Sequence, residues 1–412
     1  MTLLTDRTSQ LAMLTAIALM QGACGDTVPQ NHESPADDGW EATPFDGRTT
    51  QGDVAVGNLT ATIDGQTLAL ERRPTDLALR VTLVDALLTR AQFMGTFADF
   101  DRSVAIAQDA VQHHPNHPRA LELRARAYQA VHRFDEAQTD LEAAQALDGV
   151  DRSDAVATLL IARGTDLEQA LRIRQEAAQK RPSFATLAGL GAALAALGRY
   201  DEADTAWVDA LRHYRDVSPF PVAFVAFQRG VMWSEQADRP ERGLILYREA
   251  VQHLPAYAVA NVHLAELEWN DGDTALATER LRSVLDTTVD PEPGGLLGEI
   301  LIDLGQSREA TPLIAQARDR YLDLLERHPY AFLDHGAEFF MGPGAEPARA
   351  LELALTNLDN RRNSRAFEIA IDAAEVNGDE ELVCTLARQA QAEAQATTPL
   401  QHKLTELDHC LR

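Results

Sequence analysis

The residues best suited to hold a metal ion are the three histidines of the stretch His113-His114-Pro115-Asn116-His117. Imidazole is a common ligand of zinc and other transition metals, so three imidazoles within five positions form a candidate site. Proline and asparagine are typical turn residues, however, and the stretch lies where one predicted helix ends and the next begins. We therefore predict a turn between two helices here, and no bound metal.

Two other local patterns suggest a ligand but are better explained by helix structure. Gly189-x-Gly191 has two glycines of a nucleotide-binding loop, yet the third glycine is absent and no strand precedes it. The run from Asn270 to Asp273 lacks the ligand spacing and the closing glutamate of a calcium-binding EF-hand loop. We interpret this run as a turn that caps a helix.

The sequence also lacks the common catalytic motifs. It contains no zincin helix motif, nucleophile elbow, Walker loop or CxxC pair. Carboxylates are numerous, but they are spread over helix faces that the spacing predicts to be exposed, so an isolated acidic pair says little about catalysis. We predict that the chain is not an enzyme and that it binds no cofactor.

The start of the chain has the layout of an export signal. An apolar run from Leu11 to Met20 follows Arg7 and is too short to span a bilayer. The segment Met20-Gln21-Gly22-Ala23-Cys24 resembles a bacterial lipobox. The resemblance implies that residues 1–23 are a signal peptide and that Cys24 is lipidated, which places the protein in the outer membrane or periplasm. Secretion without an anchor, and a cytoplasmic chain with a buried first helix, remain open alternatives.

The other two cysteines, Cys384 and Cys410, both lie in the last predicted helices. If Cys24 carries lipid, these two form an even pair that an oxidising compartment could join in a disulfide. Such a bridge would staple the C-terminal cap. Two unrelated buried thiols are the alternative.

The elements that would position these side chains are helices. Residues 118–149 contain two amphipathic helices and a turn from His132 to Asp135. Small and large residues alternate at the positions where the two helices would cross, which are Leu121, Ala125, Tyr128, Ala137, Leu141 and Ala144. Alanine at a crossing lets the two backbones approach closely, while the larger side chains fill the space between crossings.

This spacing resembles the tetratricopeptide repeat, a helix-turn-helix unit of roughly 34 residues. Residues 184–210 give a second close match, and weaker matches extend the resemblance over about residues 76–392 in eight or nine units. The resemblance implies an all-α superhelix. We expect N-terminal repeats in residues 56–290, a hinge from Asp290 to Gly295, and C-terminal repeats with a capping helix in residues 291–412.

The segment before the repeats is polar, acidic and punctuated by proline and glycine. It has too little apolar surface to fold alone, so we expect a disordered acidic tether over residues 24–55. Trp40 and Phe45 are its only sizeable apolar side chains, and either could dock on the first repeat.

Residues 57–73 are ambiguous between a hairpin and a helix. Asp64-Gly65 fits a hairpin turn. A helix in which Thr62, Gln66 and Ala69 share the phase of a second repeat helix is the interpretation we prefer.

The formal net charge of −26 disfavours binding to nucleic acid or to an anionic lipid surface. Contact with a membrane is then expected only through a lipid on Cys24. The charge serves solubility, or it attracts a basic partner.

The resemblance also implies where a partner would bind. Ligands of this family lie against the inner face, which the first helix of each repeat forms. The corresponding positions in this sequence are Arg119, Glu122, Arg126, Gln129, Glu266, Trp269, Glu299, His335 and Phe339. Their mixed charges and exposed aromatic rings suit an extended peptide or a partner helix, with Arg119 and Arg126 as a local positive spot. The alternative is that most of them simply face water.

We therefore predict a non-catalytic scaffold at the bacterial cell envelope that binds an unknown protein or peptide. An accessory or regulatory subunit of an envelope enzyme, or an enzyme with a site on its loops, is the alternative.

Overall fold

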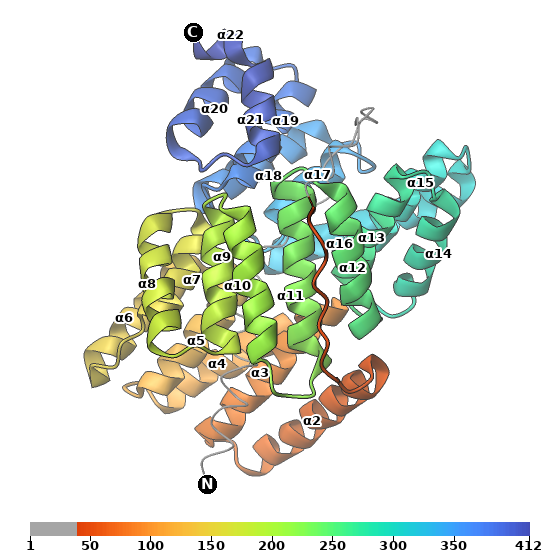
Figure 1. The fold of residues 1–412 in the computed structure, drawn as a ribbon. Helices are drawn as coiled ribbons and strands as arrows, with labels where there is room; N and C mark the ends of the chain where they lie inside the picture. Colours follow the sequence, from red (N-terminus) through yellow and green to blue (C-terminus); the bar gives the residue numbers. More distant parts are fainter. Residues whose placement is uncertain (1–38) are drawn as a thin grey trace.

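The computed structural model describes residues 39–412, and every regular element in that part of the chain is a helix (Figure 1). The helices from α3 to α20 form successive antiparallel pairs. The first helices of the pairs are α3 (Leu77–Met94), α5 (Pro118–Ala130), α7 (Ser153–Arg163), α9 (Phe184–Ala196), α11 (Pro219–Val231), α13 (Ala258–Asn270), α15 (Glu292–Asp303), α17 (Leu333–Met341) and α19 (Ser364–Val376). The second helices are α4 (Ala98–His113), α6 (Phe134–Asp148), α8 (Leu167–Lys180), α10 (Tyr200–His213), α12 (Pro240–His253), α14 (Thr274–Leu285), α16 (Ser307–Arg327), α18 (Pro347–Asn360) and α20 (Glu380–Glu393). The remaining elements are α2 (Gly52–Arg72), the π-helix η1 (Met232–Gln236), α21 (Thr398–Glu406) and α22 (Asp408–Leu411).

The predicted all-α superhelix is confirmed. First helices of neighbouring pairs lie against one another, as α13, α15, α17 and α19 do in turn, so they form one layer of the stack. Among residues 39–412, no helix combines the length and the apolar character that crossing a bilayer requires. The predicted signal peptide and Cys24 lie outside the described residues.

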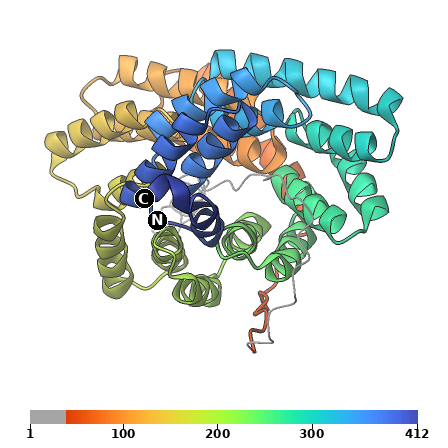
Figure 2. The ribbon, with the colours of Figure 1, turned by 90° about the horizontal axis from the view of Figure 1, so that it is seen from above.

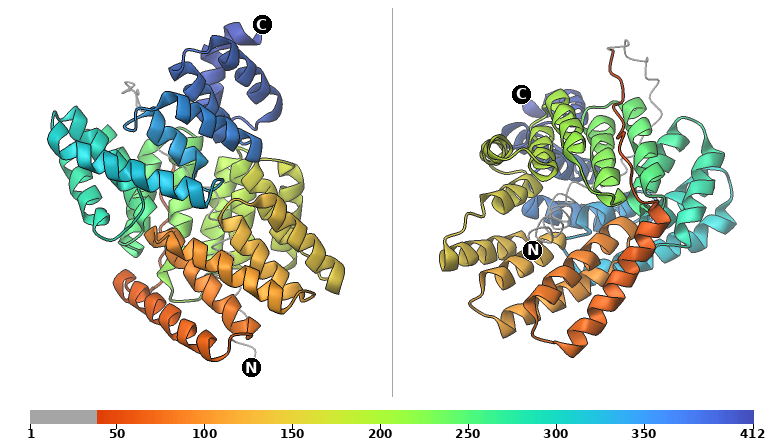
Figure 3. Two further views of the ribbon diagram at one scale, coloured as in Figure 1. Left: turned by 180° about the vertical axis from the view of Figure 1, so that it is seen from behind. Right: turned by 60° about the horizontal axis from the view of Figure 1, so that its bottom comes forward.

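The stack curves round until its later helices pass over the earlier ones (Figure 2). Hydrogen bonds join the two superhelical turns, among them Thr288 Oγ1 to Met94 O (2.9 Å), His132 Nδ1 to Tyr330 O (3.0 Å) and Arg361 Nε to Ala162 O (3.2 Å). These three bonds span 194, 198 and 199 residues, and two further bonds between the turns, Arg327 to Asp101 and Asn360 to His132, span 226 and 228. One superhelical turn therefore takes 194 to 228 residues, and the second turn rests on the first. Figure 3 shows α2 and the C-terminal helices at opposite ends of this body.

Small residues let the paired helices approach, as the sequence predicts for α9 and α10. A Cβ atom on Gly191 would lie 2.7 Å from the Trp207 ring. Trp207 is 1% exposed, and its Nε1 donates a hydrogen bond to Ala188 O at 3.1 Å. Gly230 meets Tyr247 in the same way between α11 and α12, at 2.5 Å. Gly191 is thus a helix-crossing residue.

The preference for a helix over residues 57–73 is confirmed, because residues 57–72 lie within α2 and Arg73 is its C-cap. Its phase differs from the prediction. Ala55, Leu59 and Ile63 are buried, whereas of the three predicted residues Thr62 is exposed and Gln66 and Ala69 are half-buried. The buried face is therefore centred one residue away from the predicted face.

The segment predicted as a hinge is a packed junction. Pro291 precedes α15, and Gly294 and Gly295 are buried within the first turns of that helix. Asp290 is buried, and its backbone N–H donates to Thr288 Oγ1, which itself bonds the first superhelical turn. Contact with an earlier part of the chain therefore fixes this interruption of the repeats.

The described part of the expected tether differs from the prediction. Residues 39–50 run as an extended segment along α10, α11 and α12 (Figure 1). Trp40 and Phe45 do dock, but on these three helices in the middle of the stack and not on the first repeat. Local composition could not reveal this, because the partners lie more than 160 residues away.

Candidate binding surface on the inner face

Two of the four predicted groove residues in the repeat of residues 118–149, Glu122 and Arg126, are in ion pairs. Arg126 Nη1 lies 2.7 Å from a carboxylate oxygen of Asp85 in the neighbouring first helix, α3. Glu122 accepts from Arg152 at 2.6 Å. Arg119 is exposed, whereas Gln129 is buried.

These ion pairs reduce the local positive charge that the sequence predicts at Arg119 and Arg126. Burial outweighs the nearby Arg126 and raises the pKa of Asp85, whose side chain is only 4% exposed. The charge of Arg126 is therefore directed to a buried carboxylate of its own chain, and Arg119 alone presents an exposed cation. Reversing the charge of Arg126 would disturb a buried pair and would test stability more than binding.

The predicted positions in the middle of the stack are partly accessible. Glu266, Trp269 and Glu299 are all half-buried. Trp269 packs at the edge of the cluster formed by α13, α14 and α15. Glu299 lies seven residues after Glu292, so both carboxylates lie on the same side of α15.

The two predicted positions in α17 have different surroundings. Phe339 is a core side chain, 5% exposed, with its ring 4.9 Å from Tyr321. It offers little surface to a partner. His335 is buried beside charged groups, with Nδ1 3.6 Å from Glu292 Oε1.

A buried charge network surrounds His335, and sequence spacing did not predict it. Arg361 Nη1 donates to Asp334 Oδ2 at 3.0 Å, and Arg365 is ion-paired with Glu338. Glu338 stands where the repeat pattern has a small residue, and that departure was the one local signal of the network. A second group lies where α11 ends, since Glu235 Oε1 accepts from Tyr247 Oη at 2.9 Å and lies 2.9 Å from His263 Nδ1.

The two groups approach one another where the second superhelical turn rests on the first. A cavity of about 100 Å³ lies there, between α7, α9 and η1 on one side and α19 on the other. Tyr200, Glu235, Arg365 and Glu368 are among its lining residues. Burial raises the pKa of Glu368, although Thr397 Oγ1 donates to it at 2.6 Å. The inner face is thus rich in charged groups held in fixed positions.

The stability of this network should depend on pH. Burial alone would lower the pKa of His335, but Asp334 and Glu292 outweigh it and raise the pKa to about 9. Because the folded-state pKa exceeds the ordinary 6.5, the stabilisation is complete below about pH 6.5 and is lost as the pH rises through about 9. The His335→Gln variant should be less stable than wild type by on the order of 2 kcal/mol at pH 6. Urea unfolding at pH 6, 7.5 and 10 should show this difference shrinking, and a constant difference would contradict the assignment.

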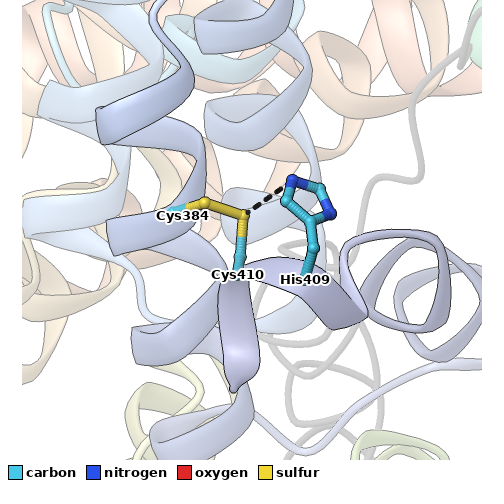
Figure 4. Close-up of side chains that lie close together, drawn as sticks. All are labelled: Cys384, His409 and Cys410. Atoms are coloured by element: carbon cyan, nitrogen blue, oxygen red, sulfur yellow. Dashed lines mark hydrogen bonds between the residues drawn. A yellow bond between two sulfur atoms is a disulfide. The ribbon is translucent and has the colours of Figure 1, made fainter.

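The C-terminal cysteines form a disulfide between α20 and α22 (Figure 4). Their Cα atoms are 4.7 Å apart, and His409 Nε2 lies 3.4 Å from Cys410 Sγ. Among the described residues, these three side chains are the only group with metal-ligand spacing. Since the two sulfur atoms are bonded to each other, the arrangement is a staple between the last helices.

The histidines at residues 113–117 have local hydrogen-bond partners. His113 Nδ1 lies 2.9 Å from Asp109 O, and His114 Nε2 lies 2.8 Å from Thr75 O. The side chain of His117 caps α5 by accepting from Arg119 N. The stretch forms the turn between α4 and α5, as predicted.

No protein-family model matches the sequence, and no curated protein matches it. The solved structures that resemble the fold include the following two. The human IFIT1 dimer with PPP-AAAA has 14% identity and a TM-score of 0.45, over 77% of this chain and 71% of that chain. Yeast Tom70 has 13% identity and a TM-score of 0.35, over 87% of this chain and 94% of that chain. The fold class rests on the helices of this chain, and not on these two likenesses.

Proposed function

We propose that this protein is a non-catalytic scaffold that binds a basic peptide or helix of a partner protein on its inner face. The observation that carries the proposal is a row of carboxylates along consecutive first helices and η1. The row consists of Glu235, Glu266, Glu292, Glu299, Glu338 and Glu368. Within the chain, Glu235 is paired with His263, Glu292 with His335 and Glu338 with Arg365, and the test below uses the half-buried Glu266 and Glu299. Carboxylates at fixed places on successive helices can pair with the cationic side chains of an extended ligand and so set its register.

Charge reversal on this row tests the proposal. In the Glu266→Lys/Glu299→Lys variant, the affinity for a stoichiometric partner purified from native membranes should fall at least tenfold, which corresponds to about 1.4 kcal/mol. The control reverses two exposed carboxylates on second helices, Glu279→Lys/Glu381→Lys, and should bind as wild type does. Equal losses in both variants would show that overall charge, and not the inner face, governs capture.

The same variants separate a scaffold from the alternative functions. If an associated enzyme loses activity only when the partner dissociates, the chain is an accessory or regulatory subunit. If the purified chain has an activity of its own that one inner carboxylate abolishes without changing helicity, the scaffold proposal is wrong.

We further propose export to the bacterial cell envelope, with a lipid on Cys24. The disulfide between Cys384 and Cys410 supports an oxidising compartment, because cytosolic thiols are normally kept reduced. Alkylation of unreduced, denatured protein from the native cell should label neither cysteine, and labelling of both would contradict export. The Cys24→Ala variant should leave the membrane fraction, and a variant that stays membrane-bound would exclude the anchor.

A further inference from the structure

Residues 39–50 lie on the molecule as a peptide lies on its receptor. The Trp40 ring packs edge-on against Trp233, with ring centroids 6.1 Å apart, and Trp40 Nε1 donates to Asp204 Oδ2 at 3.4 Å. The Arg242 guanidinium lies over both indoles, 4.9 Å from the Trp40 ring and 4.1 Å from the Trp233 ring. One aromatic side chain of the segment thus occupies a site built from α10, η1 and α12.

A second aromatic contact follows five residues later. The Phe45 ring packs edge-on against Tyr214 and His253, with centroids 6.0 Å from each. The Phe45 backbone N–H donates to Glu249 Oε1 at 2.9 Å. Between the two aromatic residues, Thr43 O accepts from Arg229 Nη1 at 3.1 Å. The segment is therefore held by two rings and by its main chain, which is how extended peptides are commonly recognised.

The surface beneath the segment is organised mainly by its own contacts. Asp204 Oδ1 accepts from Arg229 Nε at 2.7 Å and from Trp233 Nε1 at 3.1 Å. The Arg229 side chain is fully buried. Although Asp204 and Arg229 also bond the segment, their bonds to each other and to Trp233 do not involve it, so the site is preorganised for a ligand.

The segment itself is peripheral. Trp40, Ala42 and Phe45 are half-buried, while Glu41 and Thr43 between them are exposed. It has no helix or strand of its own and lies outside the repeats. Segments with few buried contacts open at low free energy, before the body to which they are attached.

We propose that the surface formed by α10, α11, η1 and α12 is a second binding site, which accepts an extended peptide with two aromatic residues five positions apart. Residues 39–50 are its resident occupant and exclude a partner segment of the same chemistry until they are displaced. Only Gln51 separates this segment from α2, so the resident peptide is present at the high effective concentration of a short tether. This site shares η1 with the carboxylate row, but the aromatic contacts use Trp233 whereas the row uses Glu235.

A peptide added in trans tests the proposal. The probe is the fluorescein-labelled peptide Gly-Trp-Glu-Ala-Thr-Pro-Phe-Asp-Gly-Arg-Thr-Thr, which reproduces residues 39–50. The receptor is the full chain carrying Trp40→Ala/Phe45→Ala, which weakens the resident segment and leaves the site intact. Fluorescence anisotropy should show binding at least tenfold tighter to this variant than to wild type, because the tethered competitor is weakened.

Two controls make the test specific. Adding Arg242→Ala to the double variant should abolish the gain in affinity for the labelled peptide, since it removes the cation that lies over the two indoles. A peptide with alanine at both aromatic positions should not bind. Circular dichroism must show wild-type helicity, and the single Phe45→Ala variant replaces the double variant if that one is unfolded.

Two outcomes would overturn the proposal. Binding to the double variant that is no tighter than to wild type would mean that the resident segment does not block a peptide site. A wild-type dimer in sedimentation that dissociates in the double variant would mean that the segment is exchanged with a second copy of the chain.

Discussion

Replacing Trp207 by alanine is expected to lower the free energy of unfolding by about 3 to 5 kcal/mol. The indole is almost fully buried at the crossing of α9 and α10, and it fills the space above Gly191. Its loss leaves a cavity between two helices of the first superhelical turn and removes the hydrogen bond to Ala188 O. Urea unfolding followed by circular dichroism measures the change.

Two milder variants measure separately the hydrogen bond and the packing that contribute to this loss of stability. Trp207→Phe keeps an aromatic ring but loses the hydrogen bond from Nε1 to Ala188 O, which should cost about 1 kcal/mol. Gly191→Ala brings a methyl group 2.7 Å from the indole and should cost about 1 to 3 kcal/mol through overpacking. A Trp207→Ala variant within 1 kcal/mol of wild type would contradict the close packing at this crossing.

Local sequence patterns predicted this crossing because both of its residues lie within one repeat. Helical spacing places Gly191 and Trp207 on facing helices, and their sizes are complementary. The sequence also offered the disulfide between Cys384 and Cys410 as one of two alternatives, because both cysteines belong to the last helices. Residue type and spacing are therefore enough to predict contacts within a repeat or between neighbouring helices.

Contacts between repeats were less predictable. The partner of Arg126 is Asp85 in another repeat, and that pairing depends on how two units rotate against one another. Small rotations at each repeat determine the pitch of a solenoid, so contacts between turns depend on the sum of many such rotations. For this reason the repeat pattern predicted His335 as a groove residue but did not predict the buried charged side chains around it.

The docking of Trp40 on α10–α12 was unpredictable for the same reason. Composition correctly marked Trp40 and Phe45 as the apolar side chains of an otherwise polar segment. The path that this segment takes is decided by Asp204 and Trp233, which the superhelix brings to its side.

Among substitutions at the contact between the two superhelical turns, the replacement of Asp334 should have the largest effect on the free energy of unfolding. Its carboxylate is ion-paired with Arg361 at 3.0 Å, and both side chains are buried. Burial alone would raise the pKa of Asp334, but His335 and Arg361 outweigh it and hold the pKa well below its ordinary value. The ion pair therefore contributes fully above about pH 4 and weakens only as the pH falls further.

Asp334→Ala should lower the free energy of unfolding at pH 7 by about 3 to 5 kcal/mol, because it leaves the Arg361 cation buried without its partner. Arg361 also bonds Ala162 O in the first turn, so small-angle X-ray scattering should show a larger radius of gyration as the two turns separate. Asp334→Leu/Arg361→Met, which removes both charges, should recover part of the loss.

The matched control is Glu202→Ala, which breaks the exposed pair with Arg199 and should cost under about 1 kcal/mol. If Asp334→Ala costs no more than this control and leaves the radius of gyration unchanged, the buried pair does not hold the two turns together. The apolar contact of Phe97 with Phe332, whose ring centroids are 4.9 Å apart, would then be the next candidate. It joins the same two turns without using charge.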